Sequence, residues 1–321
     1  MDDFMNIFRI YHTVTSLFGC FANSLLIYVA LTKTPKTIRT YSFIVINVAI
    51  TDFMICVFNF TLMQRPIAKG IQIIYISYGP CSYFSSDLCF ANYLFMLHVY
   101  THSIWLLFVS FAYRFYVFQN SEPKLWIVQS IIIILYIPSI LQLSIIFSEH
   151  GNEQRAQKLL LEWYPNYKIG NLTLSMVESI FNGYALYSVV NVCVITIPIT
   201  IGIFILRNRI LKKIFKFELN AQSKVLQLQL LKALTFQACI PVFYVFGVLC
   251  YFSQIFSLVQ NVIPQYSMFC LFIFVPTLNP ISNFVFIAPY RRYILSLIGK
   301  NQNVVPNLIF TSTTARTTIQ S

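Results

Sequence analysis

The longest run of residues without a charged side chain sets the strongest limit on how this chain can fold. It extends from Ala233 to Tyr290, a stretch of 58 residues. As one straight helix it would be about 87 Å long at 1.5 Å per residue, far longer than the roughly 30 Å hydrocarbon core of a bilayer. The polar segment Gln260–Gln265, which contains Pro264, interrupts the run. We therefore expect two membrane spans here rather than one.

Composition indicates that lipid surrounds most of this chain. Of the 321 residues, 57% are hydrophobic and only 10% are charged, whereas ordinary soluble domains have roughly 25% charged residues. This excludes a soluble enzyme of two domains, and it excludes a disordered chain, which needs low hydrophobicity. The strands of a membrane barrel would alternate in polarity. The segment Ile131–Leu135 does not alternate and is apolar on every face.

The apolar runs predict an all-α membrane protein, a seven-transmembrane helix bundle in one domain over residues 1–300. A helix needs about 20 apolar residues to cross a bilayer, and the second run contains one charge, Asp52. A short amphipathic helix is expected on the inner membrane face over 289–299. Residues 301–321, rich in Thr and Ser, are expected to form a disordered cytoplasmic tail. The seven expected spans are 10–32, 41–63, 89–113, 125–147, 183–206, 233–256 and 266–287.

The distribution of basic residues predicts the orientation. Sixteen Lys and Arg lie after the first, third and fifth spans and in the C-terminal segment, and six lie in the other connecting segments. The positive-inside rule then places the N-terminus outside and the C-terminus in the cytoplasm. The net charge of +12 is thus a topology signal. We expect no nucleic-acid partner, because the bases are split among membrane-flanking loops.

Two connecting segments are long enough to carry features of their own. The outside segment 149–178 is polar and contains the acceptor sequence Asn171-Leu172-Thr173, so Asn171 is expected to be glycosylated. Asn59-Phe60-Thr61 also matches but lies too close to the membrane to be modified. The inner segment 207–232 is amphipathic and basic, and it is expected to extend helices 5 and 6 into the cytoplasm with a turn near Glu218–Ala221.

Polar residues recur within the expected spans. Asn23, Asp52 and the pair Asn279–Pro280 lie in the first, second and seventh spans, and Arg114 ends the third. A charge in mid-membrane costs at least about 2.5–3.5 kcal/mol, so Asp52 needs polar partners or a proton. This pattern resembles rhodopsin-like receptors. The resemblance implies a polar network of Asn23, Asp52 and Asn279 and a role for Arg114 in G-protein coupling.

The chain departs from the rhodopsin-like pattern in four places. No acidic residue precedes Arg114, and no tyrosine stands at the fifth place of the sequence that begins with Asn279–Pro280. Cys239 stands where helix 6 of such receptors often has tryptophan. The outside segment 149–178 contains no cysteine, so the usual bridge from helix 3 to that loop is absent.

Several short segments follow one another along the chain in a fixed order. They are Lys33–Lys36 with Arg39–Ser42, Gln64–Arg65, Ser77–Cys81, Ser110–Arg114, and Asn279–Pro280 with Pro289–Arg291. These segments resemble the nematode serpentine receptors, and their order is most similar to serpentine receptor class delta. The resemblance covers about residues 11–300. It implies a chemosensory receptor in the plasma membrane of sensory neurons, in the cilium, that binds an odorant or pheromone-like small molecule and acts through a heterotrimeric G protein.

The third span offers a candidate ligand pocket. If Arg114 faces the bundle interior, steps of three and four residues bring Tyr93, Met96 and Tyr100 to the same side. We expect these three side chains to line a pocket between helices 3, 5, 6 and 7. Ordinary packing is the alternative, since 17% of the chain is aromatic and an aromatic face is common here.

His98 and His102 share a helix face, but a third metal ligand is not evident. We therefore expect these histidines to form hydrogen bonds with neighbouring helices, and we expect no metal or other cofactor.

Cys81 and Cys89 lie at the outer end of the third span, in an oxidising compartment. The polar stretch Ser82–Leu88 can fold back and bring them together, so we expect a disulfide. Two free thiols, or a bond to another subunit, are the alternatives.

These features favour ligand-gated signalling over catalysis. The chain contains neither a Gly-x-Ser nor a His-Glu-x-x-His pattern, and Asp52 has no second carboxylate in any span, so an enzyme is not expected. A seven-helix ligand-gated channel is an alternative, and it would place the N-terminus inside. A secondary transporter is another, and it would show an inverted repeat and paired broken helices.

The charge distribution gives a test of topology. With one epitope tag at each end, intact cells should stain at the N-terminus alone, and permeabilised cells should stain at both ends. Staining of the C-terminal tag on intact cells would reverse the orientation and favour the channel.

Overall fold

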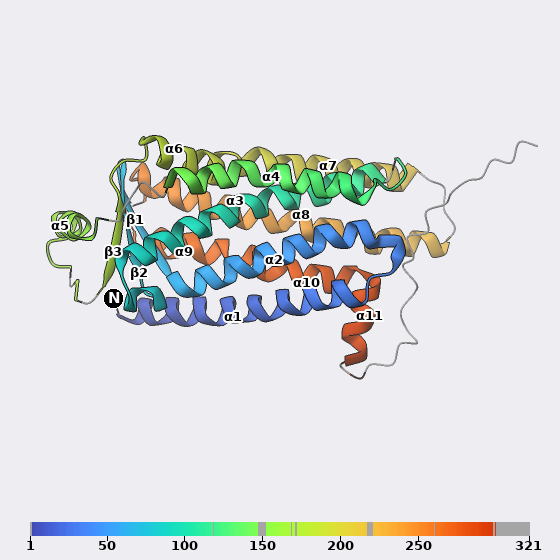
Figure 1. Ribbon diagram of the computed structural model, residues 1–321, viewed down its shortest axis with the longest axis horizontal. Coiled ribbons are helices and arrows are strands. Elements are labelled where there is room, and N and C mark those ends of the chain that lie inside the picture. Colours follow the sequence, from blue (N-terminus) through green and yellow to red (C-terminus); the bar gives the residue numbers. More distant parts are fainter. Residues whose placement is uncertain are drawn as a thin grey trace, which may run out of the picture.

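The computed structural model describes residues 2–117, 119–146, 152–167, 169–170, 172–216, 221–259, 261–297 and 299. Long helices lie side by side in an elongated bundle, with a small sheet at one end and helix α11 (Ala288–Leu297) at the other (Figure 1). We call these the sheet end and the Arg114 end. The helices of the bundle are α1 (Asp2–Thr32), α2 (Arg39–Leu62), α3 (Ser86–Val117), α4 (Leu125–Ile146), α6 (Gly183–Val189), α7 (Thr196–Lys216), α8 (Ala221–Ile255), α9 (Ile263–Phe272) and α10 (Phe274–Phe286).

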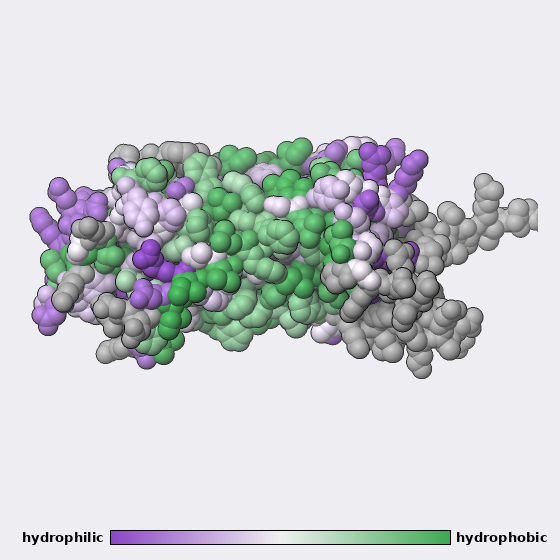
Figure 2. Space-filling model, turned by 90° about the horizontal axis from the view of Figure 1, so that it is seen from below, coloured by the Kyte–Doolittle hydropathy of each residue, from purple (hydrophilic) through white to green (hydrophobic). Residues whose placement is uncertain are grey.

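An apolar belt surrounds the bundle. Within the described residues, six helical segments are long and apolar enough to cross a membrane, and Leu125–Leu141 in α4 is a shorter apolar helix. Figure 2 shows the consequence on one face, where apolar residues cover the middle and hydrophilic ones gather towards both ends. The first helix begins at Asp2 rather than at residue 10, and the third continues to Val117. The predicted tail 301–321 lies outside the described residues.

Two of the expected spans are built from more than one helical piece. The fifth consists of α6, a π-helical turn η3 (Val190–Val194) and α7. In the π turn the Ile195 N–H donates to Val190 O at 2.9 Å. Pro198 lacks an N–H and cannot continue the ordinary ladder at this point. The seventh span divides into α9 and α10 at Ile273.

A three-stranded antiparallel sheet caps one end, and the all-α prediction missed it. It contains β1 (Gln64–Lys69), β2 (Gln72–Ser77) and β3 (Thr173–Val177) in that order. Arg65 pairs with Ile76, and Tyr75 pairs with Ser175. Most strand residues are buried, so the sheet has no exposed face to produce a polar alternation in its sequence.

The two faces of the sheet pack against different parts of the chain. Tyr75 and Val177 join the main core of the bundle, whereas Ile74 and Leu174 join a separate cluster under helix α5 (Glu153–Trp163). Asn152 caps α5 by accepting a hydrogen bond from the Arg155 N–H at 3.2 Å. The segment 149–178, expected as a polar loop, thus contributes a helix and a strand that close the sheet end (Figure 1).

A tight corner joins the sheet to α3. The chain passes through Gly79 and a 3-10 turn η2 (Pro80–Tyr83), and Cys81 is bonded to Cys89 with Cα atoms 5.2 Å apart. α3 begins only at Ser86, so the residues before it can fold back on the helix end. A Cβ atom on Gly79 would lie 2.3 Å from Thr61 O, so α2 and this corner approach each other backbone to backbone.

At the other end, α11 packs beside α1 and α2. Its bounds are close to the expected 289–299, and Ala288 and Tyr290 are its buried residues. The Tyr290 hydroxyl lies 2.8 Å from Thr34 Oγ1, and burial raises the pKa of Tyr290 to about 12. The turn expected near Glu218–Ala221 lies largely outside the described residues, which resume at Ala221.

The contact of Gly79 with backbone atoms gives a test of the fold. Gly79→Ala should lower the melting temperature of the detergent-solubilised protein, because overpacking against rigid atoms costs about 1–3 kcal/mol. Gly183→Ala is the matched control, since a Cβ at Gly183 meets no atom within 4 Å. Equal melting temperatures for the two variants would contradict the packing of this corner.

The bond between Cys81 and Cys89 is tested by counting thiols in denatured protein. Six of the eight cysteines should react with a maleimide before reduction, and all eight should react after it. Cys81→Ser should make Cys89 newly reactive without reductant. Labelling of both Cys81 and Cys89 in the unreduced wild-type chain would show that they are not bonded.

Candidate functional site

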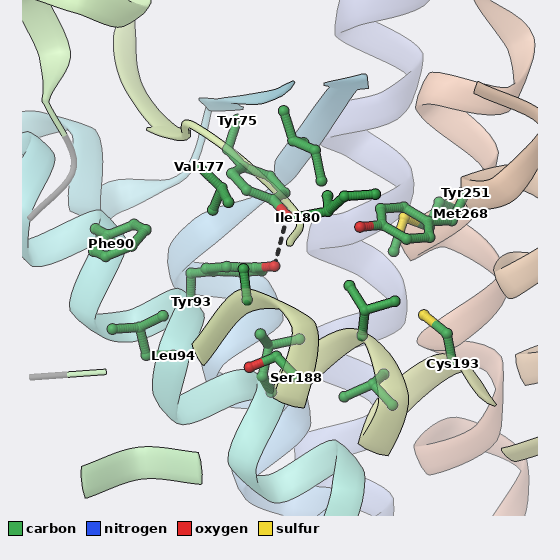
Figure 3. A pocket seen from close by; sticks show the side chains of 15 residues that line it. Tyr75, Phe90, Tyr93, Leu94, Val177, Ile180, Ser188, Cys193, Tyr251 and Met268 are labelled. Carbon is green, nitrogen blue, oxygen red and sulfur yellow. Dashed lines mark hydrogen bonds between the residues drawn. The ribbon is translucent and has the colours of Figure 1, made fainter. Parts of the chain in front are cut away.

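A cavity lies directly beneath the sheet, among α3, α6, η3, α8 and α9 (Figure 3). Its volume is about 550 Å³, including the space at its open side. β2 and β3 form the roof, and the irregular fifth span forms one wall. The lining residues are Ile73, Tyr75, Phe90, Tyr93, Leu94, Leu97, Val177, Ile180, Ala185, Ser188, Val189, Val192, Cys193, Tyr251 and Met268.

Three tyrosines supply much of the polarity of this cavity. The hydroxyls of Tyr75 and Tyr93 lie 2.7 Å apart and form a hydrogen bond, and their ring centroids are 4.5 Å apart. Tyr251 approaches from α8, with its hydroxyl turned towards that pair (Figure 3). The three side chains come from the sheet, α3 and α8, so the cavity joins elements that are far apart in sequence.

Of the three residues predicted to line a pocket, the structure brings Tyr93 to the cavity. Met96 is buried in the core and is not part of the lining. Tyr100 lies deeper in the bundle, where its ring meets Tyr244 and Phe272 at centroid distances of 5.6 and 5.4 Å. Helix periodicity correctly placed these side chains on inward faces, but it contains no information about depth, and the cavity occupies only the sheet end.

The predicted polar network is formed in part. Asp52 is completely buried, and its carboxylate accepts hydrogen bonds from Asn279 Nδ2 at 2.8 Å and Ser103 Oγ at 3.0 Å. Asn23 does not bond to Asp52. Its Nδ2 donates instead to the backbone carbonyls of Pro276 and Gly19, both at 2.9 Å. Asn23 therefore ties α1 to α10, and the buried carboxylate is shared by α2, α3 and α10.

Arg114 lies at the opposite end of α3, held by uncharged groups. Its guanidinium donates to Gln237 Oε1 on α8 and to the Tyr41 hydroxyl on α2. Gln237 Nε2 donates in turn to Ser282 Oγ at 3.1 Å. A second cavity, of about 340 Å³, lies beside this contact and includes Asn279 in its lining. We call the contact of Arg114 with Gln237 and Tyr41 the Arg114 latch.

Cys239, which stands where helix 6 of rhodopsin-like receptors often has tryptophan, is exposed in the structure. Tyr244, five residues further along α8, is buried and meets Tyr100 and Phe272. The aromatic side chain that α8 buries in this layer is therefore Tyr244.

The two histidines of α3 face the ring of Tyr136 on α4. His102 stacks on Tyr136 of α4 with ring centroids 3.5 Å apart, and His98 lies 6.2 Å from the same ring. Within the described part of the chain, no group of three or more His, Cys, Asp or Glu side chains is arranged to hold a metal ion. Asn171, the expected glycosylation site, lies outside the described residues.

Sequence reasoning missed a buried arginine beside the roof. Arg65 of β1 is 3% exposed, and it donates to Gln265 Oε1 at 3.1 Å through Nε and to the Tyr266 hydroxyl at 2.8 Å. Its guanidinium also lies over the Tyr266 ring at 4.4 Å. These contacts fasten the sheet to α9. In the sequence, Gln64–Arg65 stood out only as one of the segments that carry the family resemblance. Its role in joining the sheet to α9 could not be predicted from the sequence.

Comparison with known proteins identifies the family of this chain. Residues 8–296 match the family described as "Serpentine type 7TM GPCR chemoreceptor Srd". The chain is 35% identical over 306 residues to serpentine receptor class delta-18 of Caenorhabditis elegans, covering 94% of this chain and 91% of that protein. It is 36% identical over 297 residues to class delta-19 of the same organism, covering 91% and 88%. The chain therefore belongs to the Srd family of seven-transmembrane serpentine chemoreceptors.

Proposed function

We propose that the protein is a chemosensory G-protein-coupled receptor that binds an external small molecule in the cavity beneath the sheet. The sheet end faces outward, and the Arg114 end faces a heterotrimeric G protein in the cytoplasm. The observation that supports this proposal is a continuous chain of hydrogen bonds that runs from the buried Asp52 to Arg114. The receptor acts in the plasma membrane of a sensory cilium, and Asn171 is glycosylated on the outer side.

The hydrogen-bonded chain has four links. Asn279 donates to Asp52, and Ser282 Oγ donates to Asn279 O at 2.7 Å. Gln237 donates to Ser282 and accepts from Arg114. The chain thus passes through α2, α10, α8 and α3, so a relative shift of any of these helices changes the contacts of Arg114.

A packed aromatic layer connects the cavity to this chain. Met268 lines the cavity, and Phe272, one turn further on α9, packs against Tyr100 and Tyr244. Gly247 permits this packing, because a Cβ there would lie 2.3 Å from the Phe272 ring. Tyr100 precedes Ser103 on α3 by one helical turn, and Ser103 donates to Asp52. A ligand in the cavity therefore acts one layer away from the buried carboxylate.

Activation requires a ligand that binds the active packing more tightly than the resting packing. In the resting state the Arg114 latch holds α2, α3 and α8 together. In the active state α8 moves about Pro241, the latch opens, and Arg114 becomes available to the G protein. The wall of the cavity includes Tyr251 on α8, so ligand contacts and latch contacts belong to the same helix.

The direct test uses cells that express the tagged chain with a calcium or cyclic-nucleotide reporter and a panel of small molecules. At least one compound should give a saturable response, and Arg114→Gln should abolish it at equal surface expression. A response that persists in Arg114→Gln, or an ionic current without a G protein, would contradict the proposal.

The latch is tested without any ligand. Gln237→Leu removes the acceptor for Arg114 and the link to Ser282, so basal nucleotide exchange on the G protein should rise by about two- to tenfold, as expected for the loss of one hydrogen bond of roughly 0.5–1.5 kcal/mol.

The matched control for this test is Gln254→Leu. Gln254 is a buried glutamine near the C-terminal end of α8, and its Nε2 donates within the helix, to Cys250 O at 3.5 Å. Its basal exchange should stay at the wild-type level. An equal rise in both variants would assign the effect to loosening of α8 rather than to the latch.

A further inference from the structure

The cavity beneath the sheet has an uncharged lining. Its fifteen residues include no Asp, Glu, Lys, Arg or His. The polar side chains among them are three tyrosines, a serine and a cysteine, and the rest are apolar. Transfer of an isolated ion from water into such surroundings is strongly unfavourable unless a partner charge is present. An ionic ligand would find no partner charge on these walls.

Three charged side chains in the surrounding elements have their partners outside the cavity. Asp52 accepts two hydrogen bonds behind the Tyr100, Tyr244 and Phe272 layer. Arg65 points to the other side of the sheet, where its Nε and Nη2 donate to Gln265 and its Nη1 donates to Tyr266. Glu178, just after β3, is 2.7 Å from Arg155. None of these three groups belongs to the lining.

Tyr251 provides the one tyrosine hydroxyl of this cavity that has no hydrogen-bond partner within the described residues. The side chain is 3% exposed, and its ring packs against Phe252 at a centroid distance of 5.7 Å. Its hydroxyl points into the cavity (Figure 3), whereas the hydroxyls of Tyr75 and Tyr93 bond to each other. The Tyr251 hydroxyl is open to the cavity, so a ligand oxygen placed beside it can accept its hydrogen bond.

We infer that the ligand of this cavity is an uncharged, largely apolar molecule with one hydrogen-bond-accepting oxygen, such as a ketone, ester or ether oxygen, which accepts from the Tyr251 hydroxyl. The Tyr75–Tyr93 pair and the apolar side chains enclose its hydrocarbon part. This inference rests on the proposed function for its biological meaning, but binding can be measured without a G protein.

The experiment measures binding to the full-length chain in detergent by the rise in melting temperature. The neutral probes are small ketones and esters of about six to ten carbons. The matched charged probes are the carboxylates and alkylammonium ions of the same lengths. At least one neutral probe should bind saturably, and its charged counterparts should bind at least tenfold more weakly.

Two variants locate the contact. Tyr251→Phe removes only the hydroxyl and should weaken binding of the neutral probe by about two- to tenfold, the loss expected for one hydrogen bond. Tyr11→Phe is the control, because it also removes a partly buried hydroxyl, one that donates to Cys270 O at 2.8 Å outside the cavity lining. Its affinity for the probe should stay within twofold of wild type.

Each other outcome overturns the inference. Tighter binding of a charged probe, binding of no neutral probe, or equal affinities of Tyr251→Phe and wild type would each show that the ligand class or its contact is wrong. Saturable binding without any reporter response would instead leave the ligand class standing and contradict the proposed signalling function.

Discussion

The hydrocarbon of the bilayer is the constraint on which this architecture depends. Water is absent there, so each backbone N–H and C=O of a spanning segment must find its partner within the protein, and the helix is the form that does this locally. Regular helix is interrupted in two places near the cavity. One is the π turn η3, which lines the cavity, and the other is the break between α9 and α10. Irregular backbone is tolerated at membrane depth where protein surrounds it or where it borders a cavity. The shape of the cavity and its surroundings thus depends on places where the helical ladder is altered.

Three charged side chains at different depths, two of them buried and one partly buried, are held in the same way. Arg65 at the sheet end, Asp52 in the middle and Arg114 at the other end are each held by neutral amide or hydroxyl groups. Each set of partners comes from helices or strands that are distant in sequence. Removing a partner would leave a charge without compensation in a low-dielectric interior, so these contacts fix the register of neighbouring elements more strictly than apolar packing does.

The helices could be predicted well from the sequence, whereas the sheet end could not. Charge-free runs such as Leu88–Tyr113 are unambiguous because a helix in lipid needs an uninterrupted apolar length. β2 gave no strand signal, because both of its faces are buried and Ile73–Ile76 does not alternate in polarity. Met96 and Tyr100 lie on inward faces, as predicted, but outside the cavity lining, because helix periodicity fixes the face of a side chain and not its depth. Nothing in the sequence distinguished Tyr251, because a sequence does not tell which tyrosine hydroxyl points into a cavity.

The composition of the Arg114 latch has a consequence for the resting state of the receptor in a cell. Many salt-bridged contacts weaken when a carboxylate gains a proton or when salt screens the pair. The Gln237 amide has no proton to gain or lose near neutral pH, and its contact with Arg114 is part-buried. In the proposed activation, the separation of α8 from α3 is therefore insulated from swings in acidity and ionic strength on that side of the membrane. Under the same proposal, a cell whose internal pH and ion content change would keep a constant threshold for the next stimulus.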